Sequence, residues 1–184
     1  LLQEQKIDLI LLDVELPDTN GFELCKKIRE ISTIPIIFVS CRDDGSDIIQ
    51  GLELGGDDYV TKPFDLFQLI ARIKSNLRRI PILQQEPPKV ENVEINFALQ
   101  RLFINKEEVS LSSKEFQLFA VLFSNPSEVF SPSDLYSLVW GADSLGDIRT
   151  LKVHISRLRK KLEQHPNSSL TIQTVRGKGY SLTI

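Results

Sequence analysis

A carboxylate, a hydroxyl and an amine stand where three short runs of this sequence, each a predicted strand, come to an end. Asp13 follows the apolar run Ile7–Leu12, Ser40 follows the apolar run Ile34–Val39, and Lys62 follows the short run Asp58–Thr61. A carboxylate can attack phosphorus and form an acyl phosphate. A lysine ammonium can neutralise the oxygens of the phosphoryl group during that transfer. These residue types therefore predict a phosphoryl-acceptor site, if the fold brings the three run ends together.

The elements that carry these residues are typical of a parallel sheet. Continuous apolar runs at Ile7–Leu12 and Ile34–Val39 indicate strands buried on both faces, and Asp58–Thr61 is a third, shorter strand. Helical spacing of apolar residues predicts helices at Gly21–Ile31, Asp47–Leu54 and Asp65–Arg79. Strands that alternate with helices predict a doubly wound α/β domain, whose ligand site lies at the carboxyl ends of the strands.

The proline-rich stretch Ile80–Lys89 has no periodicity and is interpreted as a linker. The sequence after it is organised differently. Beyond it the sequence predicts strands, three helices and a closing hairpin with a basic tip: Val93–Phe97, Arg101–Ile104, Ser113–Ser124, Ser131–Trp140, Asp147–Glu163, Thr171–Val175 and Tyr180–Ile184. The chain therefore divides into 1–79, a linker at 80–89, and a second domain at 90–184.

The last predicted helix has one apolar stripe and one basic face. Leu151, Ile155, Leu158 and Leu162 recur at spacings of four, three and four. The opposite face carries cations around a lone valine, Val153, which suits a helix in the DNA major groove. Between 149 and 180 there are eight lysines and arginines and a single acid. We therefore expect double-stranded DNA as a partner, with the hairpin tip acting as a wing.

Composition excludes several other classes of protein. No apolar run reaches the roughly 18 residues that span a bilayer. Cys25 and Cys41 have no metal-ligand spacing and are interpreted as buried thiols in a reducing, cytoplasmic environment. Both histidines, His154 and His165, fall in the second domain, so a hydrolase or phosphatase with a Ser-His pair is disfavoured. We predict that the protein is not an enzyme.

The first domain resembles the receiver domain of two-component response regulators. The resemblance lies in D-L-I-L-L-D-V-E-L-P-D-T-N-G-F from position 8, P-I-I-F-V-S from 35 and G-G-D-D-Y-V-T-K-P-F from 55. It implies that Asp13 is the phosphoacceptor, Ser40 the switch hydroxyl and Lys62 the phosphate-binding lysine. Tyr59 would be the aromatic residue that turns inward upon phosphorylation, and the peptide bond before Pro63 would be cis.

The same resemblance implies a Mg²⁺ site and a rim that controls phosphate lifetime. Receivers hold Mg²⁺ with an acidic pair after their first strand, and this sequence begins later, so we expect a missing N-terminal segment. Only Asp13 and the backbone carbonyl of Glu15 remain as metal ligands, and Mg²⁺ should bind poorly to them alone. Glu15 and Arg42 match the rim positions that tune autodephosphorylation, and we expect an ion pair between them.

The second domain resembles the winged-helix (α+β) output domain of the OmpR/PhoB family. The matching motifs include L-S-S-K-E-F-Q-L from position 111, V-W-G from 139 and T-V-R-G-K-G-Y from 174. The loop Gly141–Gly146 resembles the family's contact site for RNA polymerase, and Trp140 is expected in the core. The residues expected to contact DNA are Arg149, Thr150, Lys152, Val153, Arg157, Arg159, Lys160, Thr174, Arg176 and Lys178.

Receivers of this family form homodimers through the helices that flank the Tyr59 strand. By resemblance, ion pairs between the two subunits would join Asp58 to Arg72, Glu53 to Lys74 and Asp57 to Arg79. Exposed ion pairs each contribute little free energy, so they are expected to select the partner more than to fix dimer strength.

These observations predict a phosphorylation-controlled transcriptional regulator of a bacterial two-component system. A sensor histidine kinase would phosphorylate Asp13, the receivers would dimerise, and the output domains would bind tandem DNA half-sites. One alternative stays open: a DNA-binding regulator that ignores phosphorylation and uses its receiver-like half only for dimerisation. An output that did not respond to a phosphoryl donor would favour that alternative.

Overall fold

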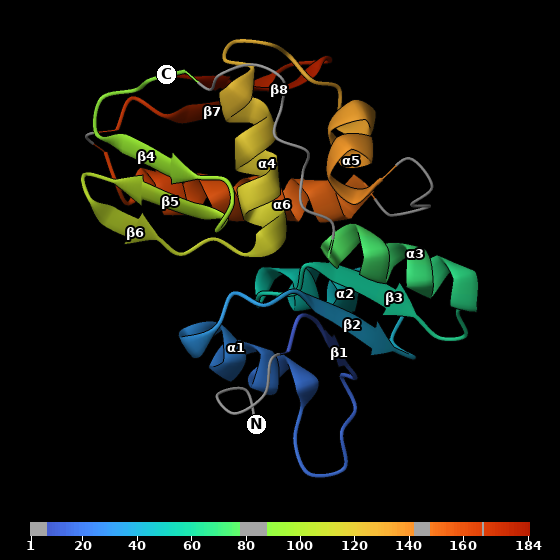
Figure 1. Ribbon diagram of the computed structural model, residues 1–184. Coiled ribbons are helices and arrows are strands. Elements are labelled where there is room, and N and C mark those ends of the chain that lie inside the picture. Colours follow the sequence, from blue (N-terminus) through green and yellow to red (C-terminus); the bar gives the residue numbers. More distant parts are fainter. Residues whose placement is uncertain (1–6, 78–87, 142–147, 167) are drawn as a thin grey trace.

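The computed structural model describes residues 7–77, 88–141, 148–166 and 168–184. Two domains follow one another along the chain and are stacked in space (Figure 1). Most of the predicted linker, and the expected polymerase-contact loop beyond Gly141, lie outside the described residues. Within the described ranges, no helix is both long and apolar enough to cross a bilayer.

The first domain is a three-stranded parallel sheet with helices on both faces. Its strands are β1 (Ile10–Leu12), β2 (Ile36–Ser40) and β3 (Asp58–Thr61), in the order β1-β2-β3. Its helices are α1 (Gly21–Ile31), α2 (Gly45–Glu53) and α3 (Leu66–Leu77). α1 and α2 pack on one face around Phe38, and α3 covers the other face around Val60. The predicted α/β class is confirmed.

Local sequence explains how the chain turns back after Asp13. The side chain of Asn20 accepts a hydrogen bond from the Phe22 amide at 2.8 Å and so caps the start of α1. A Cβ at Gly21 would lie 2.0 Å from the backbone oxygen of Asp13. Only glycine permits this close approach, which brings the first turn of α1 against the end of β1.

The second domain places three helices between two small antiparallel sheets. The first sheet contains β4 (Val93–Asn96), β5 (Arg101–Ile104) and β6 (Glu107–Val109), and the closing hairpin contains β7 (Thr171–Val175) and β8 (Gly179–Thr183). The helices are α4 (Ser113–Ser124), α5 (Pro132–Trp140) and α6 (Ile148–Glu163). This is the predicted winged-helix arrangement.

The sequence missed β6 because the preceding turn lacks the usual glycine. Asn105 and Lys106 both adopt positive φ, 53° and 69°, and reverse the chain between β5 and β6. Asparagine tolerates this conformation, but lysine rarely adopts it. The charged residues at 107 and 108 further hide the short strand, whose only buried side chain is Val109.

Capping fixes the ends of the helices that support α6. Ser112 and Glu115 form a capping box at the start of α4, and Ser131 caps α5 just before Pro132. The side chain of Trp140, at the end of α5, is buried in the core as expected. Within the wing, a Cβ at Gly179 would lie 1.8 Å from the Phe130 oxygen, so the hairpin needs glycine there.

The two domains are in direct contact over two pairs of helices. α6 lies against α2, and α5 contacts α3 (Figure 1). Val153 of α6 belongs to the same hydrophobic cluster as Phe38 and Leu52 of the first domain. The packing of the first domain therefore includes a residue that the sequence had assigned to an exposed surface.

Candidate functional site

The carboxyl ends of the three parallel strands bring the predicted phosphorylation residues to one rim. Asp13 follows β1, Ser40 ends β2 and Lys62 follows β3. The Lys62 ammonium lies 2.5 Å from one Asp13 carboxylate oxygen, and the other oxygen accepts the Glu15 amide at 3.0 Å. The Ser40 side chain is buried, and its hydroxyl oxygen accepts a hydrogen bond from the Arg42 amide. Parallel pairing thus joins residues 49 positions apart.

The electrostatics of the rim keep the Asp13 carboxyl ionised. The hydrogen bond from Lys62, helped by the amides of Glu15 and Val14, lowers the pKa of the Asp13 carboxyl below its usual value. The same hydrogen bond raises the pKa of Lys62. At neutral pH the pair is therefore a carboxylate beside an ammonium. That ammonium is within reach of a phosphoryl group attached to the same carboxylate.

The described residues do not by themselves supply a Mg²⁺ site. Among them, no three His, Cys, Asp or Glu side chains are grouped so that they could hold a metal ion. Asp13 offers one carboxylate, and the Glu15 carboxylate is paired with Arg42 instead. Because Mg²⁺ takes about six oxygen ligands, these residues are too few.

Tyr59 lies in the inward position. Its side chain is buried and packs at 5.9 Å from the ring of Phe38. Its hydroxyl donates to the backbone oxygen of Arg42 at 3.0 Å, in the loop that follows Ser40. Burial raises the pKa of Tyr59, so the phenol stays protonated and keeps this donor role. The Lys62–Pro63 peptide is cis, as the resemblance predicted.

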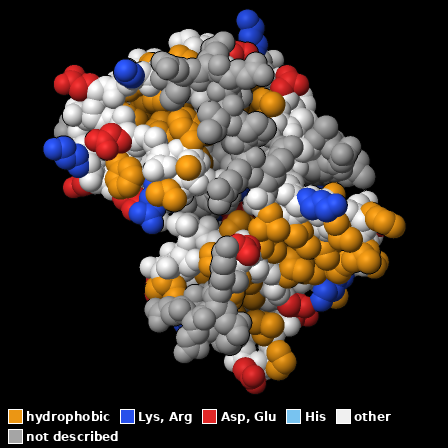
Figure 2. Space-filling model, viewed as in Figure 1, with side chains coloured by type: hydrophobic (Ala, Val, Ile, Leu, Met, Phe, Trp, Pro, Cys, Tyr) orange, Lys and Arg blue, Asp and Glu red, His pale blue; other side chains and the backbone are white. Residues whose placement is uncertain are grey.

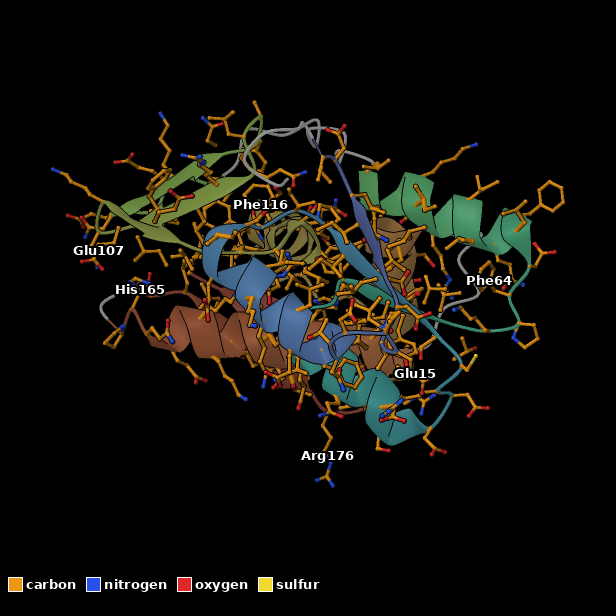
Figure 3. All side chains as sticks on the ribbon, turned by 90° about the horizontal axis from the view of Figure 1, so that it is seen from below. Glu15, Phe64, Glu107, Phe116, His165 and Arg176 are labelled. Carbon is orange, nitrogen blue, oxygen red and sulfur yellow. The ribbon has the colours of Figure 1, made fainter. Side chains whose placement is uncertain are left out.

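The expected ion pair at the rim is present and has a third member. The Arg42 Nε atom lies 3.4 Å from the Glu15 carboxylate, and its Nη1 atom lies 3.6 Å from the carboxylate of Asp47. Glu15 projects from the β1–α1 loop beside α2 (Figure 3), and Asp47 is in the first turn of α2. The sequence did not predict the Asp47 contact, which joins the rim around Asp13 to α2. Cys41, next to this arginine, is exposed, so the prediction of two buried thiols is wrong for Cys41 and right for Cys25.

Six of the ten expected DNA contacts are open to solvent. The exposed residues come from both the helix and the wing, and Arg176 extends away from the body of the protein (Figure 3). They are Arg149, Lys152, Lys160, Arg176 and Lys178, all of them cations, to which the wing residue Thr174 adds an exposed hydroxyl.

The centre of the expected DNA-reading face is covered, so its predicted exposure is wrong for this arrangement. Val153 is 8% exposed and Thr150 is 2% exposed. Arg157 donates to the backbone oxygen of Leu52 at 2.9 Å and forms an ion pair with Glu115 at 3.0 Å. The helical pattern identified this face correctly as distinct from the core stripe, but could not reveal that α2 lies on it.

Arg159 supports the wing. Its Nε atom donates to the backbone oxygen of Ile172 at 2.9 Å, and its Nη2 atom donates to the Thr174 hydroxyl at 2.7 Å. The guanidinium also lies over the Tyr180 ring. Arg159 and Thr174 therefore hold α6 against the hairpin, and any contact with DNA would have to share these bonds.

Asp57 connects the two domains. Its carboxylate is fully buried, pairs with Arg29 at 2.7 Å and accepts the Ser112 hydroxyl of the second domain at 2.6 Å. Burial alone would raise the pKa of Asp57, but Arg29 and the hydrogen bonds from Ser112 and Ile36 hold it below its usual value. Sequence reasoning had paired Asp57 with Arg79 across a dimer. Arg79 lies outside the described residues, and Asp57 is fully engaged within this chain.

Of the two other expected dimer pairs, one forms within a single chain and the other is exposed. Arg72 donates from Nη1 to both carboxylate oxygens of Asp58, at 2.8 and 2.9 Å, within one chain. Glu53 and Lys74 are exposed. Sequence reasoning missed Arg29, Ser112 and the buried Lys114 as contributors to this region. Ser112 lies 55 positions from Asp57, and no periodicity links them.

Comparison with known proteins supports both halves of the chain. The family model described as "Response regulator receiver domain" matches residues 1–74, and the one described as "Transcriptional regulatory protein, C terminal" matches 106–182. An uncharacterised transcriptional regulatory protein of Bacillus subtilis (strain 168), YclJ, is 44% identical, covering 96% of this chain and 80% of that protein.

A second relative in sequence and one solved structure are similar to this chain over almost its whole length. The heme response regulator HssR of Staphylococcus aureus is 38% identical over 99% of this chain and 81% of its own length. A solved structure of a cysteine-to-serine mutant of RitR, 26% identical, superposes with a TM-score of 0.76 over 98% of this chain and 81% of that one. A superposition confined to one domain would leave about half of the residues unmatched, so the domain arrangement is similar too.

The rim ion pair generates a prediction about phosphate lifetime. Water must approach an acyl phosphate on Asp13 from the open side, where Glu15 and Arg42 are joined. Glu15→Ala and Arg42→Ala should each speed loss of the phosphate, and the double variant should add little to Arg42→Ala. Decay of the phosphorylated form, followed by Phos-tag electrophoresis, measures this. Unchanged or strictly additive rates would contradict the gate.

The buried histidine predicts a pH dependence of folding. Desolvation, assisted by the charge of Arg157, lowers the pKa of His154 from 6.5 to about 4. The neutral His154 side chain contributes its full stabilisation above pH 6.5, the pKa that it has in the unfolded chain. This stabilisation is lost as the pH falls from 6.5 toward the folded-state pKa of about 4. Asp57 and Glu115 have lowered pKa values and remain ionised over most of this window.

Between pH 7 and pH 5 the free energy of unfolding should therefore fall by about 2 kcal/mol on account of His154. Urea titrations at several pH values measure this fall. The matched His154→Gln variant should lose most of the pH dependence in this range, whatever its absolute stability. A variant with the parental slope would show that another group is responsible.

Proposed function

Because this chain belongs to the response regulators whose receiver is followed by an OmpR/PhoB-type DNA-binding domain, we propose that phosphorylation of Asp13 controls its activity in transcription. One observation carries the proposal: the Lys62 ammonium lies 2.5 Å from the Asp13 carboxylate at the carboxyl ends of the sheet. Members of this family regulate transcription in two-component systems, and we place this one in the cytoplasm as a regulator rather than an enzyme.

The proposed chemistry is transfer of a phosphoryl group from a sensor histidine kinase. A carboxylate oxygen of Asp13 forms a bond to phosphorus as the bond from phosphorus to the kinase histidine breaks. Lys62 neutralises the phosphoryl oxygens, and Ser40, at the end of β2, donates its hydroxyl to one of them. Receiver domains in general use Mg²⁺ for this reaction; here Asp13 and the Glu15 carbonyl are the candidate ligands, and the other ligands would have to come from outside the described residues.

The proposed output is binding to two DNA half-sites in tandem. α6 enters the major groove with Val153 and Arg157 toward the bases, while Lys152, Lys160 and the wing cation Lys178 contact phosphates. The sequence assigned the first domain to 1–79 and the second to 90–184, so the intervening linker would set how far the output domains can separate from their receivers. RNA polymerase would be contacted through residues 141–146.

Homodimerisation through the α2–β3–α3 face brings the two output domains together. Hydrophobic side chains gather over α3 on the face seen in Figure 2, where Leu66, Phe67 and Ile70 are exposed. An apolar surface of this kind is commonly covered by another protein surface. Glu53 and Lys74 are exposed and free to select the partner copy, as the resemblance implies.

Phosphorylation at Asp13 is tested by mass spectrometry of the intact protein, in the longest form that its gene encodes. Incubation with acetyl phosphate and Mg²⁺ should add one acid-labile phosphoryl group, and Asp13→Asn should add none. Operator binding by the parent should tighten at least tenfold on phosphorylation, a difference of about 1.4 kcal/mol. A labelled Asp13→Asn variant would refute the assignment. Labelling without any change in DNA binding would favour a regulator that uses its receiver only for dimerisation.

Operator recognition should separate base contacts from phosphate contacts. Phosphorylated protein should protect half-sites about 10–11 bp apart. In that state Arg157→Ala should reduce discrimination between operator and random DNA, because a bidentate arginine–guanine contact is lost. Lys178→Ala should weaken both equally and lower the slope of log K against log salt by about 1. Fluorescence anisotropy over a salt series measures these quantities. Equal loss of discrimination in both variants would contradict this division.

A further inference from the structure

A cavity of about 340 Å³ lies between the two domains, at the end of the parallel sheet that is away from Asp13. The receiver contributes Asp8 before β1, residues 33–35 before β2 and the last two residues of α3. The output domain contributes residues 98–100, in the turn between β4 and β5, and the start of α4. None of the described residues that line the cavity belongs to the rim around Asp13 or to α6.

The cavity has the size and the mixed lining of a small-molecule site. Such sites have volumes of roughly 300–1,000 Å³, apolar walls with a few polar groups, and a preference for the places where domains meet. Here Ile34, Leu77 and Leu111 supply apolar wall. Leu99 also lines the cavity and is 65% exposed, so an apolar side chain from the output domain is open to an incoming molecule.

One wall of the cavity carries a buried acceptor that lacks a partner. Asn76 is 2% exposed, and its Oδ1 atom has no hydrogen-bond partner among the described residues. Its Nδ2 atom donates to the backbone oxygen of Arg72 at 2.9 Å, one turn earlier on α3. A carbonyl oxygen can only accept, so the amide nitrogen must face Arg72 and the orientation of the amide is fixed. Oδ1 therefore points away from Arg72, at the wall of the cavity.

This unpaired oxygen favours a ligand that brings a hydrogen-bond donor. An unpaired buried polar atom costs free energy, and most such atoms in folded proteins are paired with protein, water or ligand. The output domain does not offer Asn76 its nearby hydroxyl, because Ser113 donates to the Gln100 Oε1 atom at 3.1 Å. A molecule in the cavity gains most when its own donor faces Asn76.

The charges around the cavity favour a cation. Asp8 is the one acid among the eleven described residues that line it, and none of the eleven is a lysine or an arginine. α3 ends at Leu77, so its last carbonyls add the partial negative charge of a helix C-terminus. A donor that is also positively charged therefore fits better than a neutral one.

The start of α4 does not reverse this preference. A helix N-terminus attracts anions through its free amides. Here the Lys114 amide lies 3.4 Å from the Asp57 carboxylate, and the Glu115 amide donates to the Ser112 hydroxyl. An anionic ligand would be repelled by Asp8 without gaining these amides in return.

We propose that this cavity binds a small organic ammonium. Its nitrogen donates to Oδ1 of Asn76, and the Asp8 carboxylate balances its charge. Its apolar part packs against Ile34 and Leu111. Because the ligand contacts the receiver and the output domain at once, its binding stabilises the folded two-domain molecule. The inference goes beyond the proposed function, since it requires neither a phosphoryl group nor DNA.

The test uses phenethylamine, a primary amine with a short apolar body, and the full chain without a phosphoryl donor. Isothermal titration calorimetry should show one site per chain. Phenethyl alcohol keeps the apolar body but has no charge, and the amine should bind about tenfold or more tightly than this alcohol. The anionic counterpart, 3-phenylpropionate, should not bind measurably. The unfolding temperature should rise with the concentration of the amine.

Two variants assign the binding to this cavity. Asn76→Leu removes the unpaired oxygen at similar volume and should lower the affinity for phenethylamine about tenfold or more. Asp8→Asn keeps the shape of an exposed side chain, should lower the affinity by a similar factor, and should remove most of its salt dependence. Asp18→Asn is the matched control: it makes the same change at an exposed position beyond the other end of β1 and should leave the affinity at the parental value. Circular dichroism verifies that each variant is folded.

The outcomes distinguish this inference from the proposed function. Selective binding of the amine that is lost in Asn76→Leu and in Asp8→Asn, and kept in Asp18→Asn, supports the site. No measurable binding of phenethylamine, equal binding of the alcohol, or binding that survives either cavity variant in folded form overturns it. Preferential binding of 3-phenylpropionate overturns it equally. Failure of Asp13 to accept a phosphoryl group would refute the proposed function and would leave each of these results unchanged.

Discussion

The buried carboxylate of Asp57 is the interaction on which the arrangement of this protein depends. It sits between Arg29 of the receiver and the capped start of α4, fully removed from solvent. A buried charge is tolerated only when its partners replace the lost water, and removal of one partner leaves a large desolvation cost. The receiver and the output domain each supply part of that replacement. Their relative position is therefore defined by a polar network, in addition to the apolar contact of Val153.

This arrangement places the receiver on the face of α6 that the sequence predicts to read DNA. Arg157 meets the end of α2, Glu115 and, by proposal, DNA, so its guanidinium has competing partners of similar chemistry. Glu115 has a lowered pKa because Arg157 and Lys161 outweigh its burial, and its carboxylate therefore stays ionised and paired with these two cations of α6. A helix that binds DNA through cations is readily held by carboxylates and carbonyls of its own chain.

The sequence predicted most local features because they depend on short-range physics. The bounds of α1, β3, β5 and α4 follow from capping residues and apolar spacing, and the observed elements begin and end where these patterns do. The approach of Lys62 to Asp13 followed from the rule that parallel strands place their carboxyl ends together. The sequence did not predict strand β6, because the turn before it has Lys106 at a positive φ where glycine is usual. The pairing of Glu15 with Arg42 was also foreseen, from two loops at the same rim.

The sequence by itself thus determined the two folds, the rim at which Asp13, Ser40 and Lys62 meet, and the two faces of α6. Only the tertiary structure decided what covers the basic face. Amphipathic spacing tells which residues lie on a common side of a helix, but a lone valine among cations suits a DNA groove and a protein surface equally. Asp57 shows the same limit: its charge suited a dimer pair, and its burial against Ser112 depends on a contact between segments 55 residues apart. Such contacts form when folded domains pack against each other, and no local periodicity in the sequence encodes them.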